Sequence, residues 1–144
     1  MTRDNVVAFF ERWERTWAER DVDALANMYT ETCKVSSPMF GQINGRTAVA
    51  ESYRRLFSAF PDWTLTTEDL IVDDGNVAQV FTVTATHKGD FMGLPGTGRK
   101  AQIHGARILR FTDGLIHEER RLYDFTLLLM QVGVLRGKPG HGTP

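Results

Sequence analysis

The chain has 144 residues, of which 42% are hydrophobic and 24% charged, a balance typical of one soluble globular domain and unlike a disordered or fibrous chain. Seventeen lysines and arginines stand against eighteen aspartates and glutamates, so no net positive field favours nucleic acid or anionic lipid as a partner. Cys33 is the only cysteine, which excludes an intramolecular disulfide framework and a cysteine-based zinc site.

These properties predict a cytoplasmic protein. A lone thiol suits a reducing compartment, and no segment approaches the roughly 18 apolar residues that a membrane helix needs. We expect a single domain over residues 1–135 and a flexible tail over residues 136–144.

The first half of the chain has the hydrophobic period of helices. An amphipathic helix is predicted over roughly residues 3–19 from apolar residues at helical spacing: Val6, Phe9, Phe10, Trp13 and Trp17. Asp21 is a candidate cap for a second, short helix. A short strand and a loop are expected within residues 34–40, where Ser36-Ser37-Pro38 breaks a helix. A third helix is predicted from Arg46 to Phe60, because Pro61 disfavours helical geometry in the residue before it.

After Trp63 the pattern becomes that of strands. Two hairpins are predicted, one from segments 63–72 and 76–87 and one from segments 100–111 and 115–125. Residues 125–134 form a short apolar run that predicts a final helix or turn. Helices followed by an antiparallel meander predict an α+β fold, with the helices packed on one face of a curved antiparallel sheet.

Several standard chemistries find no support in the sequence. A GxSxG nucleophile elbow is missing. Gly93–Lys100 superficially resembles a phosphate-binding loop, but it leads into a predicted strand rather than a helix. His87, His104 and His117 fall on three different strands without paired spacing, so no metal site is expected.

The register of the second hairpin decides which polar residues meet. A two-residue turn at Asp113-Gly114 would place Arg107 opposite Arg120, which brings like charges together. A three-residue loop with a glycine bulge would place Arg107 opposite Glu119 instead. Cross-strand pair energies of about 0.2–1 kcal/mol favour the second register.

In that register Gln102, His104 and Asp124 share one face of the sheet. Asp124 in partly apolar surroundings could then exchange protons near neutral pH, with His104 holding it or completing a relay. A structural alternative stays open, in which Asp124 caps the closing helix and His104 is a satisfied core residue. The charged run 118–121 is expected to be structural. Helices on a bent sheet are expected to leave an aromatic-lined cavity suited to a flat, largely apolar molecule.

Three stretches together resemble the SnoaL-like polyketide cyclase, or ester cyclase, family. They are, in chain order, FSAFPDW (57–63), HKGDFMGLPGTGR (87–99) and RFTDGLIHEERRLYDFTLLLMQVG (110–133). The resemblance implies a cone-shaped α+β fold shared with nuclear transport factor two and ketosteroid isomerase. It also implies a cofactor-free intramolecular aldol condensation, of lyase or isomerase type, that closes the last ring of an anthracycline-type polyketide methyl ester.

The resemblance implies roles for particular residues. Asp124 matches the family's acid/base aspartate, and Gln102 and His104 would position or polarise the substrate. Candidate wall residues of the pocket are His87, Trp13, Tyr53, Trp63 and Phe40. No cofactor or metal is expected, and the expected partner is a small, hydrophobic, aromatic polyketide-like substrate.

Two further hypotheses remain beside the cyclase. One is a non-enzymatic module of the same fold that binds a small molecule. The other is a different chemistry in the same pocket, such as isomerisation or epoxide hydrolysis, of which the latter requires two aspartates and an arginine around a water. The outer face of the sheet, with Val80, Thr82 and Thr84, is expected to form a homodimer or homotetramer interface.

Overall fold

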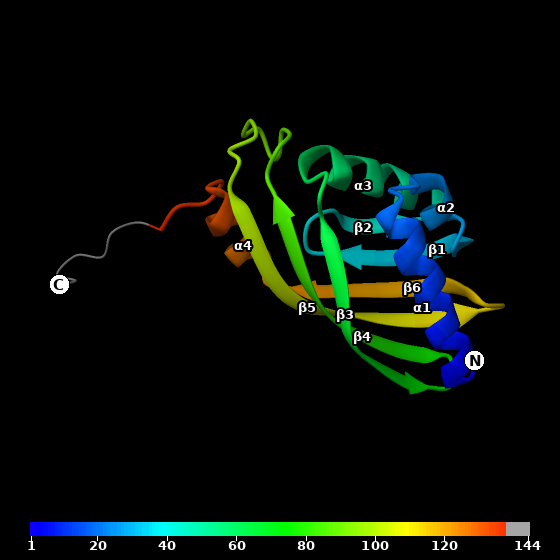
Figure 1. Ribbon diagram of the computed structural model, residues 1–144. Coiled ribbons are helices and arrows are strands. Elements are labelled where there is room, and N and C mark those ends of the chain that lie inside the picture. The colour runs from blue at the N-terminus through cyan, green and yellow to red at the C-terminus, as the bar shows by residue number, and fades with distance from the viewer. Residues whose placement is uncertain (138–144) are drawn as a thin grey trace.

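The computed structural model describes residues 1–137, so residues 138–144 of the predicted tail lie outside the described part. Helices cover one face of a curved six-stranded sheet whose strand order is β2-β1-β6-β5-β4-β3 (Figure 1). The helices are α1 (Arg3–Ala18), α2 (Val22–Ala26), α3 (Arg46–Ala59) and α4 (Phe125–Val132). The strands are β1 (Tyr29–Ser37), β2 (Gly41–Asn44), β3 (Thr64–Asp73), β4 (Asn76–Thr86), β5 (Lys100–Thr112) and β6 (Leu115–Tyr123). This architecture confirms the predicted α+β class.

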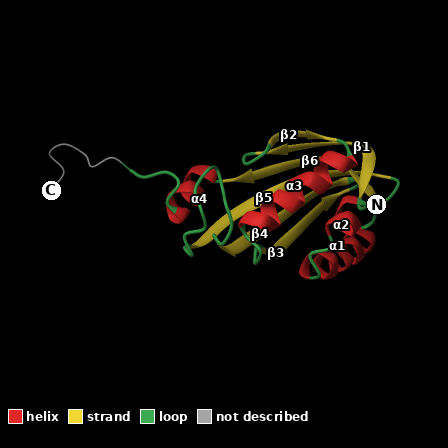
Figure 2. Cartoon of the chain, turned by 90° about the horizontal axis from the view of Figure 1, so that it is seen from above, coloured by secondary structure: helices red, strands yellow, loops and turns green. Residues whose placement is uncertain are grey.

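The helices begin and end where local chemistry predicts. Thr2 caps α1 by accepting a hydrogen bond from the amide of Asn5, at 3.2 Å, and Asp21 caps α2 by accepting from the amide of Ala24, at 3.0 Å. Helix α3 ends just before Phe60, ahead of Pro61. The predicted apolar stripe of α1 is buried, and α1 contacts β3 while α3 contacts β1 and β2 (Figure 2).

Strand β1 differs from the prediction in extent and direction. It starts at Tyr29 rather than near Lys34, with Tyr29, Cys33 and Val35 buried in the core. It also runs parallel to β6, so the expectation of a wholly antiparallel sheet is wrong at this pair. The reason is that β1 enters the sheet from α2 rather than through a hairpin, so no tight turn fixes it antiparallel to its neighbour. Strand β2, which pairs with the far edge of β1, was not predicted.

Neither register considered for the β5–β6 hairpin is correct. The turn is a two-residue one, with both Asp113 and Gly114 at positive φ, and it pairs Thr112 with Leu115. An irregularity between the pairs Phe111–Ile116 and Arg110–Glu118 then adds one residue to β6, as in a β-bulge. This shift places Arg107 opposite Arg121, and it turns Glu119 and Arg121 toward the helices.

Candidate ligand pocket

A pocket lies between the concave face of the sheet and helices α1 and α3. The enclosed cavity has a volume of about 40 Å³, and it lies within a wider opening of about 450 Å³ of empty space, part of which is open solvent. All three tryptophans of the chain line it, together with Phe40, Tyr53 and Phe81. The predicted aromatic-lined cavity is therefore confirmed.

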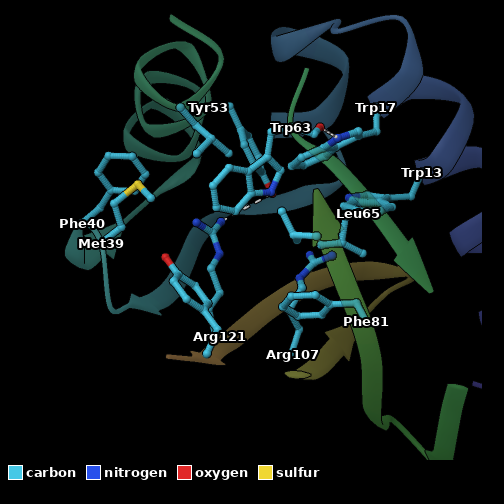
Figure 3. A pocket seen from close by; sticks show the side chains of 13 residues that line it. Trp13, Trp17, Met39, Phe40, Tyr53, Trp63, Leu65, Phe81, Arg107 and Arg121 are labelled. Carbon is cyan, nitrogen blue, oxygen red and sulfur yellow. Dashed lines mark hydrogen bonds between the residues drawn. The ribbon is translucent and has the colours of Figure 1, made fainter. Parts of the chain in front are cut away.

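The aromatic wall is held by contacts among its own members. Trp13 and Trp17 lie one helical turn apart on α1, and their rings are 4.8 Å apart. The indole N–H of Trp17 donates to the carbonyl oxygen of Trp63 at 2.7 Å (Figure 3). Trp17 also meets Tyr53 of α3 edge-on at 5.4 Å, so helix α1, helix α3 and the start of β3 are joined around the pocket. Preformed apolar walls of this kind suit a flat ligand.

Two arginines rise from the sheet toward these aromatic rings (Figure 3). One carboxylate, that of Glu119, pairs with both. Glu119 accepts hydrogen bonds from Nε and Nη2 of Arg107 at 3.2 and 3.0 Å, and from Nε of Arg121 at 2.5 Å. The hydroxyl of Tyr29 donates to the same carboxylate. Glu119 and Arg107 are almost fully buried, which makes this a buried ion cluster rather than a surface pair.

The cluster continues through neutral polar groups. Tyr53 and Tyr29 share a hydrogen bond of 2.7 Å between their hydroxyls. Gln79 accepts from Nη1 of Arg107 at 2.8 Å and donates to the hydroxyl of Thr67. The aromatic walls also make cation–π contacts with the two arginines. The guanidinium of Arg107 lies 4.7 Å from the Trp13 ring centre, and that of Arg121 lies 5.3 Å from the Tyr53 ring centre.

The protonation states of the cluster follow from burial and charge. Burial by itself would raise the pKa of Glu119, but the charges and hydrogen bonds of Arg107 and Arg121 outweigh it and lower the pKa to about 2. Burial and the nearby Glu119 charge raise the pKa of Tyr29, and burial raises that of Tyr53. At neutral pH the cluster thus holds two cations, one anion and two neutral phenols, with one net positive charge at the pocket.

Glu119 is a poor candidate for a general base. A base must be able to take up a proton near the operating pH. Glu119 has a strongly lowered pKa, and its two oxygens already accept four hydrogen bonds. The cluster is instead suited to holding negative charge on a ligand.

A family model described as SnoaL-like polyketide cyclase matches residues 8–132. The chain belongs to this family. No match was found among curated proteins.

Solved structures of other proteins are similar to this SnoaL-like chain over most of its length. AclR from Streptomyces galilaeus, named as a candidate hydroxylase, is 25% identical with a TM-score of 0.81, and the match covers 94% of this chain and all of that one. IdmH from Streptomyces antibioticus, named as a candidate polyketide cyclase, is 24% identical with a TM-score of 0.73, over 90% and 96% of the two chains. A protein of ketosteroid isomerase-like fold from Catenulispora acidiphila is 17% identical with a TM-score of 0.73, over 92% and 95%. The latter two show the fold alone, which is that of nuclear transport factor two and ketosteroid isomerase.

Four of the residues predicted for the SnoaL-like site come together in the structure. Trp13, Phe40, Tyr53 and Trp63 all line the pocket. They come from α1, the β1–β2 turn, α3 and the segment before β3, which are distant in sequence.

The other predicted site residues lie elsewhere. Gln102 and His104 are on the outer face of β5, where His104 contacts Thr82 at 3.0 Å and the backbone of Gln102 is bonded to the side chain of Gln131. Asp124 is exposed and caps α4 by accepting from the amide of Leu127 at 2.9 Å, as the structural alternative proposed. His104 is exposed rather than a core residue, so that half of the alternative is wrong.

His87 is fully buried away from the pocket walls. Its Nδ1 lies 3.0 Å from the hydroxyl of Thr97, and its ring packs beside Phe60 and Phe91. His87 therefore joins the loop before β5 to the core. It does not contribute to the aromatic wall.

The residues missed by the sequence analysis are Arg107, Glu119 and Arg121. Arg107 could have been found, because it stands in the same alternating series of β5 as buried Ile103 and Leu109. Glu119 and Arg121 could have been found with it, because the favoured hairpin register already places Glu119 opposite Arg107, and Arg121 is two residues further along the same alternating series. The site was instead expected on the opposite face of the sheet, that of Gln102, His104 and Asp124.

Within residues 1–137, no helix is long and apolar enough to cross a membrane. Over the same residues, no group of three or more His, Cys, Asp or Glu side chains is placed to hold a metal ion.

Proposed function

We propose that this SnoaL-like protein is a cofactor-independent cyclase that closes a ring in an aromatic, polyketide-like carbonyl compound by intramolecular aldol condensation. The observation that carries the proposal is an aromatic pocket with two arginines at its base and one carboxylate whose oxygens already accept four hydrogen bonds. The aromatic walls suit a planar substrate, and the arginines suit the negative charge that develops on oxygen during the reaction.

In the proposed reaction the substrate provides its own activation. A carbon acid next to an ester and a delocalised quinone gives its proton to solvent at the open side of the pocket, the resulting carbanion carbon bonds to the ketone carbon, and the ketone oxygen becomes an alkoxide that takes a proton back from solvent. The walls would fold the chain so that these two carbons meet. Arg121 would stabilise the enolate and alkoxide oxygens directly, and the buried charge of Arg107 would add to the positive field at the base of the pocket.

The acid/base roles of Asp124 and His104 stay predictions. Neither side chain lines the pocket, so the proposal rests on charge stabilisation and orientation by the residues that do. Asp124 directly follows Tyr123, a lining residue.

Epoxide hydrolysis is less well supported by the same pocket. It was expected to need two aspartates with an arginine around a water. In the part of the chain that the structure describes, the pocket-lining side chains include no carboxylate, and Glu119 beneath them is saturated with donors. A binding module without catalysis remains the second candidate, because the pocket alone would serve it.

Turnover of a methyl-esterified anthraquinone polyketide precursor tests the proposal. We expect cyclised product from the wild type and a loss of about tenfold to a thousandfold in kcat/KM for Arg121→Met, which removes one cation from the pocket. Arg110→Met is the matched control, because Arg110 is exposed and pairs only with exposed Glu118. Absence of product from folded wild type would overturn the cyclase and favour the binding module.

Asp124→Asn, assayed alongside, decides the role of Asp124. Asparagine preserves the helix cap but cannot exchange a proton. A large loss of turnover in a folded variant would assign Asp124 the acid/base step. Retained turnover would assign it only the cap.

A further inference from the structure

We infer that the pocket selects its ligand as an anion: a planar aromatic molecule whose carboxylate, or ionised phenol or enol, binds Arg121. This rests on the proposed function in that it uses the same pocket, and it adds the charge state of the substrate. Three independent features of the pocket carry it: an unbalanced charge, unused donors on one arginine and an unused indole N–H.

The charge at the base of the pocket is not balanced by the protein. Arg107 and Arg121 share the single carboxylate of Glu119, and the two tyrosines hydrogen-bonded to the cluster are neutral. Taking a charge out of water is costly unless an opposite charge accompanies it. A ligand that brings one negative charge would make the cluster neutral, whereas a neutral ligand would cover the excess cation with apolar surface.

The two arginines differ in how much of their donor capacity the protein uses. Arg107 donates from Nε, Nη1 and Nη2, to Glu119, Gln79 and Tyr29. Arg121 donates from Nε to Glu119 and from Nη2 to the hydroxyl of Tyr53, at 3.4 Å. Its Nη1 has no acceptor among residues 1–137, and its side chain is 11% exposed where it lines the pocket. Arg107 therefore anchors the cluster, and Arg121 is the arginine with donors left for a ligand.

Trp13 provides a second unused donor in the same wall. Its side chain is 1% exposed, and its indole Nε1 has no hydrogen-bond partner within the described residues. A buried N–H without an acceptor is destabilising, so a site that presents one is poised to gain from a ligand oxygen. Trp13 contacts Arg107 through its ring face and lines the same pocket as Arg121, so the unused N–H belongs to a side chain of the wall beside the cluster.

A binding experiment tests the charge preference without any turnover. All three tryptophans of the chain line the pocket, so intrinsic fluorescence reports its occupancy directly. The probes are anthraquinone-2-carboxylate, which is ionised at pH 7, and its neutral methyl ester, which has the same rings. We expect the carboxylate to bind about tenfold or more tightly than the ester.

Variants assign the preference to one side chain. Arg121→Met should reduce carboxylate affinity by about tenfold while leaving ester affinity within about twofold, and Arg121→Lys should recover part of the loss because it keeps the charge but not the planar fork. Arg110→Met, an exposed charge on the outer side of the sheet, should change neither. Circular dichroism confirms that each variant is folded.

Either of two results would overturn the inference. One is equal affinity of the wild type for carboxylate and ester, a comparison that needs no variant to fold. The other is a loss of affinity in Arg121→Met that is the same for both probes. If the wild type prefers the carboxylate but does not turn over the precursor, the inference holds and the proposed cyclase activity is wrong. If the wild type turns over the precursor but binds carboxylate and ester equally, the cyclase holds and the inference is wrong.

Discussion

Glu119 is the residue on which the charged base of the pocket depends. It is the shared anion of Arg107 and Arg121, and its side chain is fully buried. Its neighbour Glu118 instead faces outward and pairs loosely with Arg110, at 3.6 Å. The two glutamates are therefore a matched pair of buried and exposed positions on one strand.

Replacing Glu119 by glutamine should destabilise the protein strongly. The variant leaves two buried guanidinium groups without a counter-charge, which typically costs about 3–5 kcal/mol. Glu118→Gln, the control, should cost less than about 0.5 kcal/mol because its ion pair is exposed. Urea unfolding monitored by tryptophan fluorescence measures both free energies, and equal effects would mean that the cluster does not stabilise the fold.

The lowered pKa of Glu119 predicts how stability depends on pH. Its ordinary pKa of 4.5, which holds in the unfolded chain, falls to about 2 in the folded one. Between these values the unfolded chain binds a proton that the folded chain does not, so the contribution is complete above pH 4.5 and is lost as the pH falls toward 2. The loss should be on the order of 3 kcal/mol.

Urea midpoints measured between pH 6 and about pH 3 check this dependence. Glu119→Gln should show a shallower decline than the wild type over that range, because glutamine does not titrate. Parallel declines in the two proteins would show that other carboxylates cause the acid sensitivity.

At the scale of elements, the irregularity in β6 and the cap of α4 decide how the charged residues are used. The extra residue near His117 turns Glu119 and Arg121 to the concave face, while Glu118 stays outside. At the other end of the same strand, Asp124 ends β6 and starts α4. Strand β6 and the residue that follows it, Asp124, thus set both the charge of the pocket and the position of α4.

Asp124→Ala should weaken the start of α4. Loss of the side-chain acceptor for the amide of Leu127 should cost about 1 kcal/mol, whereas Asp124→Asn should cost only a few tenths because asparagine is an equally good cap. Thermal unfolding of the two variants beside the wild type measures the difference. No difference between alanine and asparagine would mean that the cap contributes nothing to stability.

At the scale of the whole molecule, the outer face of the sheet remains without a described partner. It carries Val80, Thr82 and Thr84 of β4 and the exposed apolar side chain of Leu122 on β6. The homodimer or homotetramer expected at this face stays a prediction.

Light scattering at micromolar protein concentration tests that prediction. A dimer would have twice the chain mass of 16.3 kDa. A particle of 16.3 kDa at those concentrations would exclude assembly through this face.

The helices, the strands after Trp63, the fold class and an aromatic-lined cavity could all be predicted from the sequence. These depend on short-range physics: the apolar stripe of residues 3–19, the caps at Asp21 and Asp124, and the stop before Pro61 are all local patterns. Trp13, Phe40, Tyr53 and Trp63 were named as wall residues through the family resemblance and line the pocket, whereas His87, named with them, does not.

Only the tertiary structure decided the chemistry of the pocket. Strand β1 runs parallel to β6 because nothing in the local sequence fixes the direction of a strand that enters without a hairpin. The favoured hairpin register and the observed one both put Arg107 and Glu119 on one face of the sheet and Gln102, His104 and Asp124 on the other. Alternation with a period of two sorts side chains into two faces, but which face becomes the pocket depends on where α1 and α3 pack, and those contacts join segments far apart in the sequence.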